Sequence, residues 1–359
     1  MCLPLSTERS SVKDSNTFLV ETLRSLTSIP SPSGRTEQIV GWTVELLQSW
    51  GFEPELTRRG AIKLKLPGKD SSRARALTAH LDTLGAMVRH LKNNGRCALA
   101  PVGTWSSRFA EGARVTLHTD EHEYRGTILP LLASGHAYNE KVDQQPVNWE
   151  QVELRIDEYC NSFQELEKLG VQPGDFVSID TGTEVLENGF IFSRHLDDKA
   201  GVAAVLNALR LLHEAGHQLP CTTYLILTVR EEIGDGGSAV LSPDVWELVT
   251  IDNGVQAGTQ HSREFGVTLA MGDKTGPFDR RLVLHLDRIC KENQLSHQRD
   301  LFKHYRSDLA AAVEAGFDVR TALIAIGLDG SHGHERTHLD AIRTASELAH
   351  IYLLSPLLD

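Results

Sequence analysis

Cysteine is scarce in this sequence and forms no motif. The chain has 359 residues and five cysteines, and no two of them stand in a C-x-x-C arrangement. Scattered cysteines in an odd number argue against a disulfide framework and against a thiolate zinc site. We expect reduced, mostly structural thiols at all five positions, which are Cys2, Cys97, Cys160, Cys221 and Cys290.

Long apolar runs and basic clusters are also missing. The longest apolar segments, such as residues 224–229 and 322–326, are far shorter than the ~20 residues of a membrane-spanning helix. The formal net charge is −12 without a block of Lys and Arg, which disfavours binding to a nucleic-acid backbone. The start, MCLPLSTERSS, lacks the features of a secretory signal. We therefore expect a cytoplasmic protein without membrane or nucleic-acid partners.

Two common catalytic motifs are absent as well. No G-x-S-x-G turn follows a predicted strand, which disfavours a serine hydrolase. The segment GDGGS lacks the lysine and the spacing of a phosphate-binding loop. A serine or cysteine hydrolase and a nucleotide-binding protein are therefore weak interpretations.

Helical and strand patterns alternate at the two ends of the chain. Apolar residues make up 40% of the sequence, which is typical of globular proteins. Helical periodicity predicts helices over residues 16–29, 36–51, 198–215, 278–292, 307–315 and 339–354. Short apolar runs predict strands over residues 53–57, 62–66, 75–79, 222–229, 248–251 and 321–326. This alternation indicates an α/β fold.

The middle of the chain has a different pattern. Residues 113–119 and 124–129 alternate at period two, residues 152–156 predict another strand, and helices are short. We expect a β-rich domain over residues 88–190, inserted into a catalytic α/β domain formed by residues 1–87 and 191–359. The insert would serve dimerisation or gating rather than supply catalytic groups.

Candidate site residues stand mainly after the predicted strands. In an open α/β sheet, ligands bind beyond the carboxyl ends of the strands. Five separate places put His, Asp or Glu there or at the start of the helix over residues 198–215. They are His80 with Asp82, Asp197 with Asp198, Glu231 with Glu232, Asp252, and His332 with His334. We expect these side chains to meet at one edge of the sheet.

Each place alone has a simpler explanation. Asp197 and Asp198 suit the N-terminus of a helix, where carboxylates accept from free N–H groups. Asp252 suits an ordinary turn, and Glu231 with Glu232 suits a solvated one. One shared cause explains the pattern better, because the separate explanations would all have to hold at once.

A pair of divalent metal ions suits these residue types. Imidazole and carboxylate ligands without thiolate suit zinc, cobalt or manganese. One shared carboxylate permits the separation of about 3.5–4 Å between the ions of two-metal hydrolases. The attacking water still needs a base that is not itself a ligand. Of the adjacent Glu231 and Glu232, one would bind a metal ion and the other would act as the base.

Taken together, the motifs resemble those of the co-catalytic zinc aminopeptidases of the tetrahedral and glutamyl aminopeptidase type. The similarity runs over almost the whole chain, and the segments that carry it are SLTSIPSPSG, AHLDTLGAMV, VQPGDFVSID, HLDDKAGVAAVL, TVREEIGDGGS and RSDLAAAVEAGFDVRTALIAIG. The resemblance implies a zinc-peptidase fold, with a mixed central sheet flanked by helices and an inserted small β-barrel-like domain. It also implies a homo-oligomer built from dimers, often a hollow dodecamer.

The resemblance implies two metal ions per subunit, zinc first and cobalt or manganese as alternatives. Asp197 would bridge both ions. Asp252 would share its ion with His80, and Glu232 would share the other with His332. In the same way, the resemblance makes Glu231 the general base and gives Asp82 the role of orienting the first histidine.

The sequence departs from the family pattern at two places. Thr83 follows Asp82, where the family commonly has a glutamate. The final histidine region reads SHGHERTHLD, which leaves His334 as an alternative to His332 and His338 as a more distant one. This region looks most like a branch of hydrolases associated with the synthesis of N-acetylglutaminylglutamine amide, an osmoprotectant.

Three functions compete at this point. The first is a two-metal aminopeptidase that cleaves an amide bond of small peptides. The second is a deacylase or processing hydrolase that acts on an N-acetylated glutamine-type dipeptide. The third is a non-catalytic metal-bound scaffold, which Glu231 argues against because a pure binding site needs no base.

Overall fold

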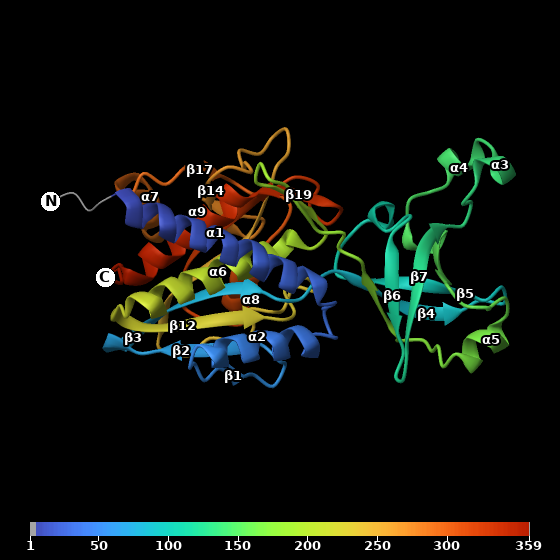
Figure 1. The fold of residues 1–359 in the computed structure, drawn as a ribbon, viewed down its shortest axis with the longest axis horizontal. Helices are drawn as coiled ribbons and strands as arrows, with labels where there is room; N and C mark the ends of the chain where they lie inside the picture. Colours follow the sequence, from blue (N-terminus) through green and yellow to red (C-terminus); the bar gives the residue numbers. More distant parts are fainter. Residues whose placement is uncertain (1–4, 359) are drawn as a thin grey trace.

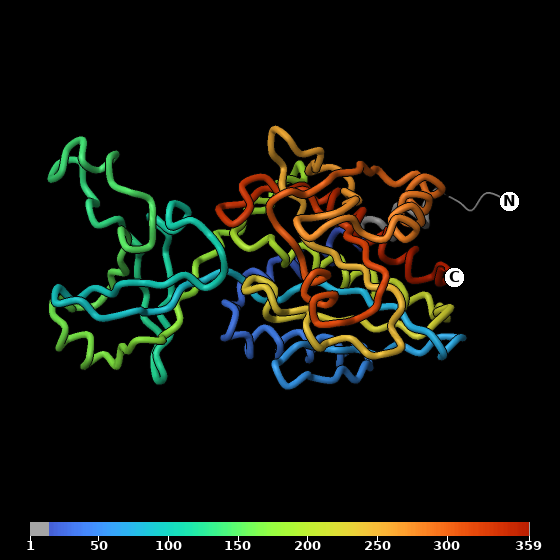
Figure 2. Tube along the Cα trace, turned by 180° about the vertical axis from the view of Figure 1, so that it is seen from behind, coloured from blue at the N-terminus to red at the C-terminus, as the bar shows by residue number. Residues whose placement is uncertain are grey.

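Two lobes of different architecture make up the chain (Figure 1). The structure is a computed structural model that describes residues 5–358, with side chains described from residue 14 onward. The larger lobe holds a central sheet and the long helices, and the smaller lobe holds a closed barrel. Seen from behind, a few extended segments join the two lobes (Figure 2).

The central sheet is mixed, as the family resemblance implies, and has eight strands. Its middle strands β12, β3, β13 and β18 run parallel, whereas β1, β2 and β14 pair in antiparallel fashion. At the far edge, β17 runs parallel to β14. The order across the sheet is β1 (Glu55–Leu56), β2 (Ile62–Leu66), β12 (Leu219–Thr228), β3 (Gly68–His80), β13 (Val245–Val255), β18 (Arg320–Leu328), β14 (Val267–Ala270) and β17 (His297–Asp300).

Long helices cover this sheet. Helices α6 (Leu196–Ala215) and α9 (Leu339–Leu354) pack side by side against its middle strands, and α1 (Leu5–Ser28) contacts both helices (Figure 1). Helix α6 is buried almost all round because it lies between the sheet, α1 and α9. The other helices of this lobe are α2 (Glu37–Ser49), α7 (Arg280–Glu292) and α8 (Asp308–Glu314).

The apolar runs of the sequence mark the centre of the sheet. Strands β12 and β13 are buried on both faces, which explains their continuous apolar stretches. Strand β13 runs four residues past the predicted end at residue 251, because Asp252 and Asn253 are buried in the sheet and not in a turn. Strand β17 was not predicted, since its sequence HQRD has no apolar pattern.

The smaller lobe is a closed six-stranded antiparallel barrel, which confirms the expected barrel-like insert. Ala86 of the first strand pairs with Val177 of the last and closes it. Alternating residues such as Val115 and Leu117 fill its interior. The order around the barrel is β4 (Gly85–Leu91), β5 (Arg96–Val102), β8 (Val152–Ile156), β7 (Glu123–Pro130), β6 (Arg114–His118) and β9 (Phe176–Ile179). Short helices α3 (Gly135–Tyr138), α4 (Lys141–Gln144) and α5 (Phe163–Lys168) lie between its strands in the chain.

A third, small sheet joins the end of the insert to the C-terminal region. It contains β10 (Glu184–Val185), β11 (Phe190–Ser193) and β19 (Glu335–His338), all antiparallel. Strand β10 therefore pairs outside the barrel. We propose that the insert spans residues 85 to about 180, which is shifted from the 88–190 expected from the sequence.

Two further expectations from the sequence concern membrane-spanning helices and the state of the cysteines. Within the described residues, no helix is long and apolar enough to cross a membrane. Four of the cysteines are free, and three of these are buried: Cys97, Cys221 and Cys290. Cys2 lies outside the described residues.

Candidate metal centre

Strand register brings the first candidate residues to one edge of the central sheet. His80 is the last residue of β3 and pairs with Thr228, the last residue of β12. Glu231 follows Thr228 by three residues and so stands just beyond the same edge. We expected Asp252 to follow the strand over residues 248–251, but it lies inside β13. Because Thr250 pairs with Thr78, Asp252 is level with His80.

Asp197 lies between two histidines from distant parts of the chain. Its Oδ1 is 3.1 Å from Nε2 of His80, and its Oδ2 is 3.3 Å from Nε2 of His332. Burial raises the pKa of Asp197, but its hydrogen bonds with His332 and His80 outweigh this effect and hold it below the usual value. An aspartate placed in this way offers one oxygen to each of two ligand sets.

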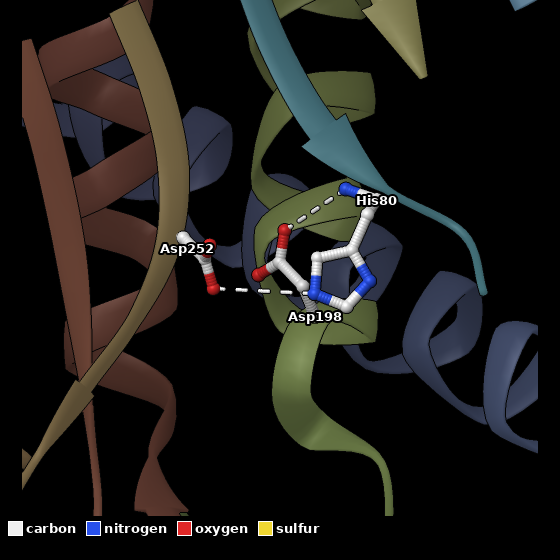
Figure 3. Close-up of side chains that lie close together, drawn as sticks. All are labelled: His80, Asp198 and Asp252. Carbon is white, nitrogen blue, oxygen red and sulfur yellow. Dashed lines mark hydrogen bonds and ion pairs between the residues drawn. The ribbon is translucent and has the colours of Figure 1, made fainter. Parts of the chain in front are cut away.

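Asp198 stands beside this arrangement but is used differently. Its Oδ2 accepts from the backbone N–H of His80 at 3.2 Å, and its Oδ1 accepts from that of Gly201 at 3.1 Å. Ligand atoms of His80, Asp198 and Asp252 lie within 4.8 Å of one another, as do those of His80, Asp197 and Glu232. Figure 3 shows the ring of His80 directed at Asp252, whose Oδ1 is 4.0 Å from Nε2. Asp198 therefore ties the start of α6 to β3 and also borders one candidate site.

The two adjacent glutamates face different histidines. Oε2 of Glu231 is 3.7 Å from Nε2 of His80, and Oε2 of Glu232 is 3.7 Å from Nε2 of His332. Oε1 of Glu232 is buried without a hydrogen-bond partner. A buried carboxylate oxygen without a partner is costly unless a cation satisfies it. The environment of Glu232 thus fits a metal ligand.

The three histidines of the C-terminal run go to three different places. His332 reaches Asp197 and Glu232. His334 is exposed, with its Nε2 near Gly182. The Nδ1 of His338 accepts from the backbone N–H of Asp340 and so caps α9. The structure therefore brings His332 into the centre and leaves the other two outside.

Asp82 lies behind His80 but bonds elsewhere. Nδ1 of His80 is 3.0 Å from the backbone carbonyl of Asp82 and 3.6 Å from its carboxylate. The carboxylate instead accepts from the hydroxyl of Ser33 and from the backbone N–H groups of Glu231 and Glu232, at 3.1 and 3.3 Å. Asp82 thus connects β3 to the turn that carries both glutamates.

Buried carboxylates crowd this centre. Burial and the charge of Asp252 raise the pKa of Glu231 well above its usual range. Burial and the charge of Asp197 also raise the pKa of Glu232 well above its usual range. The same two causes raise the pKa of Asp252 to about 8. Burial opposes protonation of His332, yet its hydrogen bond to Asp197 and the charge of Glu232 raise its pKa to about 10. A divalent cation would supply the positive charge that these groups lack.

Glu335 and Asp308 belong to the surroundings of the centre and were missed in the sequence. Oε2 of Glu335 accepts from the backbone N–H of Asp197 at 3.1 Å, and Oε1 accepts from that of His332 at 2.9 Å. Asp308 accepts from the hydroxyl of Thr228, and burial raises its pKa to about 6. The available signals were the spacing of Glu335, three residues past His332, and the place of Asp308 at the start of a predicted helix.

An open pocket of about 970 Å³ leads to the centre. Asp197, both glutamates, Asp252 and His332 line it, and so do Gly103, Thr104, Trp105, Ser106 and Phe109 of the smaller lobe. This volume suits a small ligand. The donor set of imidazole and carboxylate, the partnerless oxygen of Glu232 and the raised pKa values together fit divalent metal ions.

Comparison with known proteins agrees with this chemistry. The family described as M42 glutamyl aminopeptidase matches residues 60–348. YhfE of Bacillus subtilis (strain 168), which is named as an aminopeptidase, is 36% identical over 339 residues, covering 94% of this chain and 98% of YhfE. The TET aminopeptidase of a Thaumarchaeota archaeon from marine sediment has a TM-score of 0.85 at 20% identity and covers 94% of this chain and 96% of its own. The TET1 peptidase of Pyrococcus horikoshii has a TM-score of 0.84 at 21% identity, covering 94% of this chain and 100% of its own.

These similarities confirm the resemblance seen in the sequence and the fold that it implies. The family match covers most of the chain and includes every metal-ligand candidate from His80 to His332. The chain therefore belongs to the M42 glutamyl aminopeptidase family and is a metal-dependent hydrolase of peptides.

Proposed function

We propose that the protein is an aminopeptidase that removes residues from short peptides with two divalent metal ions, preferably zinc, with cobalt or manganese as substitutes. The observation that carries this proposal is the position of Asp197, whose two oxygens face His80 and His332 separately. One ion would be held by His80, Asp197 and Asp252. The other would be held by Asp197, Glu232 and His332.

The ions would supply Lewis-acid activation of the attacking water and of the scissile carbonyl. Glu231 lines the pocket beside this centre and has no ligand role in the proposal. Its carboxylate would take a proton from the attacking water and deliver it to the nitrogen of the leaving amine. Asp82 would hold the Glu231–Glu232 turn in place through the two backbone N–H groups that it accepts.

We also propose a homo-oligomer in the cytoplasm. TET1 peptidase of Pyrococcus horikoshii assembles into a tetrahedron or an octahedral shell, and the PhTET1 structure is a dodecamer. The shared fold supports a similar dimer-based assembly, including a dodecamer. The four free cysteines support a reducing compartment.

The test measures metal content and turnover together. Chelation should abolish hydrolysis of free short peptides, and Zn²⁺, Co²⁺ or Mn²⁺ should restore it. The same peptides with an acetylated N-terminus are the matched control, and an aminopeptidase should leave them intact. Cleavage of only the acetylated peptides would replace the proposal with a deacylase or processing hydrolase. Full activity of a verified metal-free preparation would rule out the two-metal mechanism, and bound metal without turnover of either set would indicate a scaffold.

A further inference from the structure

The smaller lobe reaches the proposed metal centre through one loop. Residues 103–109 follow β5 of the barrel and form one wall of the pocket. We call this segment the 103–109 loop. It contributes no side chain of the residue types that bind metal in the proposed set. Its contacts with the centre, however, fall on one of the two ligand sets.

The first contact is with the ring of His332. Nδ1 of His332 lies 2.9 Å from the backbone carbonyl oxygen of Thr104, which can only accept a hydrogen bond. In the neutral ring that a metal ligand needs, the proton would therefore sit on Nδ1, and the lone pair of Nε2 would face Asp197 and Glu232. A carbonyl that fixes a histidine in this way raises its strength as a ligand.

Two further contacts lie on either side of that hydrogen bond. Gly103 has a φ of +83°, and a Cβ there would lie 3.3 Å from the backbone oxygen of Glu232. Phe109 packs on the residue that follows His332, since a Cβ at Gly333 would lie 3.0 Å from its ring. The loop thus borders Glu232 and His332, two of the three ligands of one proposed ion.

The loop is anchored in the barrel lobe. Nε1 of Trp105 donates to the backbone oxygen of Gly85, and Nε1 of Trp149 donates to that of Trp105, at 3.0 and 3.2 Å. The two indole rings also contact each other edge to face, with centroids 4.8 Å apart. Movement of the barrel would therefore be transmitted to this loop.

The other ligand set is held differently. The contacts of His80 come from Asp82, Asp197, Asp198, Glu231 and Asp252, all in the larger lobe. Its side chain is 1% exposed, whereas that of His332 is 31% exposed. The ring of His332 therefore receives from the loop a hydrogen bond of the kind that the ring of His80 obtains within the larger lobe.

We propose that the inserted barrel, through the 103–109 loop, holds the metal site of Glu232 and His332 and has no part in holding that of His80 and Asp252. Trp105 and Phe109 are positioning residues in this proposal. The inference rests on the proposed two-metal function and adds that the two sites are supported by different lobes.

The test is a titration of the metal-free full-length protein with Zn²⁺, read as bound metal per subunit after equilibrium dialysis. Wild-type protein should bind two ions. Phe109→Ala and Trp105→Ala should keep one binding step unchanged and weaken the other by about 10-fold or more, the usual effect of losing a group that supports a ligand. Tyr138→Ala is the matched control, because Tyr138 lies in the same lobe and is 40% exposed, as Phe109 is.

Comparison variants assign the weakened step. His332→Ala should remove the same step, and Asp252→Asn should weaken the other one. Two unchanged steps in both loop variants, or equal weakening of both steps, would overturn the inference and leave the proposed function standing. Failure of the wild-type protein to bind two ions would instead overturn the proposed function. If Trp105→Ala does not fold, Phe109→Ala, at an exposed position, still decides the outcome.

Discussion

Ser193 and Glu335 face each other across the antiparallel pair β11–β19. This pairing brings two segments together that are far apart in the chain. One leads into Asp197 and the other comes from His332, so the small sheet sets the distance between a shared carboxylate and a histidine of the centre. Glu335 then accepts from the backbone N–H groups of both residues.

Replacing Glu335 tests this arrangement. Glu335→Gln keeps the shape but leaves one oxygen to accept from two backbone N–H groups, which should cost about 1–3 kcal/mol of unfolding free energy. We expect weaker metal binding, by about 10-fold, together with a lower thermal midpoint. Glu247→Gln is the control, since Glu247 is equally buried and accepts from Tyr352 and Leu358 away from the centre. The control should lower the midpoint without changing metal binding; an equal loss of metal in both variants would contradict the assignment.

The choice between the C-terminal histidines is testable by single substitutions. His332→Ala should lose one metal ion and nearly all activity, because its Nε2 is the atom that faces Asp197 and Glu232. His334→Ala should keep both ions and most of the activity, because its ring is exposed beside Gly182. Metal analysis and turnover of the two variants are the measurements. The reverse result would move the ligand role to His334.

Glu231 and Asp197 should respond differently to the loss of charge. Glu231→Gln should still bind two ions, and its turnover should fall by a factor of about 10² to 10⁴, the contribution of a positioned general base. Asp197→Asn should lose one or both ions, and the stability linked to metal binding should fall with them. Rate, metal occupancy and thermal midpoint are measured on both. If Glu231→Gln loses metal as badly as Asp197→Asn, then Glu231 is a ligand and Glu232 becomes the candidate base.

The stability of the metal-free protein should fall between about pH 6 and pH 8. Burial and the charge of Asp197 raise the pKa of Asp252 and of Glu335 to about 8. Between about pH 4 and pH 8 the folded chain keeps these protons and the unfolded chain has lost them, so the free energy of unfolding decreases with pH. His332, with a pKa of about 10, adds to the trend, because its contribution is complete below about pH 6.5 and is lost toward pH 10.

Thermal unfolding at two pH values measures this effect. The metal-free protein should unfold at a higher temperature at pH 6 than at pH 8. Saturating Zn²⁺ should cancel or reverse the difference, because metal binding displaces the same protons. Asp252→Asn should reduce the difference in the metal-free protein. A metal-free wild-type protein that is more stable at pH 8 would show that these carboxyl groups are not protonated in the folded chain.

Local patterns in the sequence predict most of the larger lobe. The strand over residues 62–66 and the helix over residues 339–354 match β2 and α9, because period-two and helical burial leave a direct mark on the residue order. The positions of His80, Glu231 and Glu232 near strand ends also follow from such patterns. Their residue types alone indicate metal chemistry, since imidazole and carboxylate without thiolate suit divalent ions.

Tertiary structure decided what local patterns do not encode. His332 and His334 stand two residues apart in a loop without periodicity, and contacts with Asp197 and Thr104, both more than 100 residues away in the chain, determine which ring enters the centre. Glu335 lies beside Asp197 and His332 because β19 pairs with β11. The sequence by itself therefore determined the α/β elements and the kind of chemistry. Only the packing of distant segments determined which side chains share a metal site, because that depends on contacts between residues that local order does not relate.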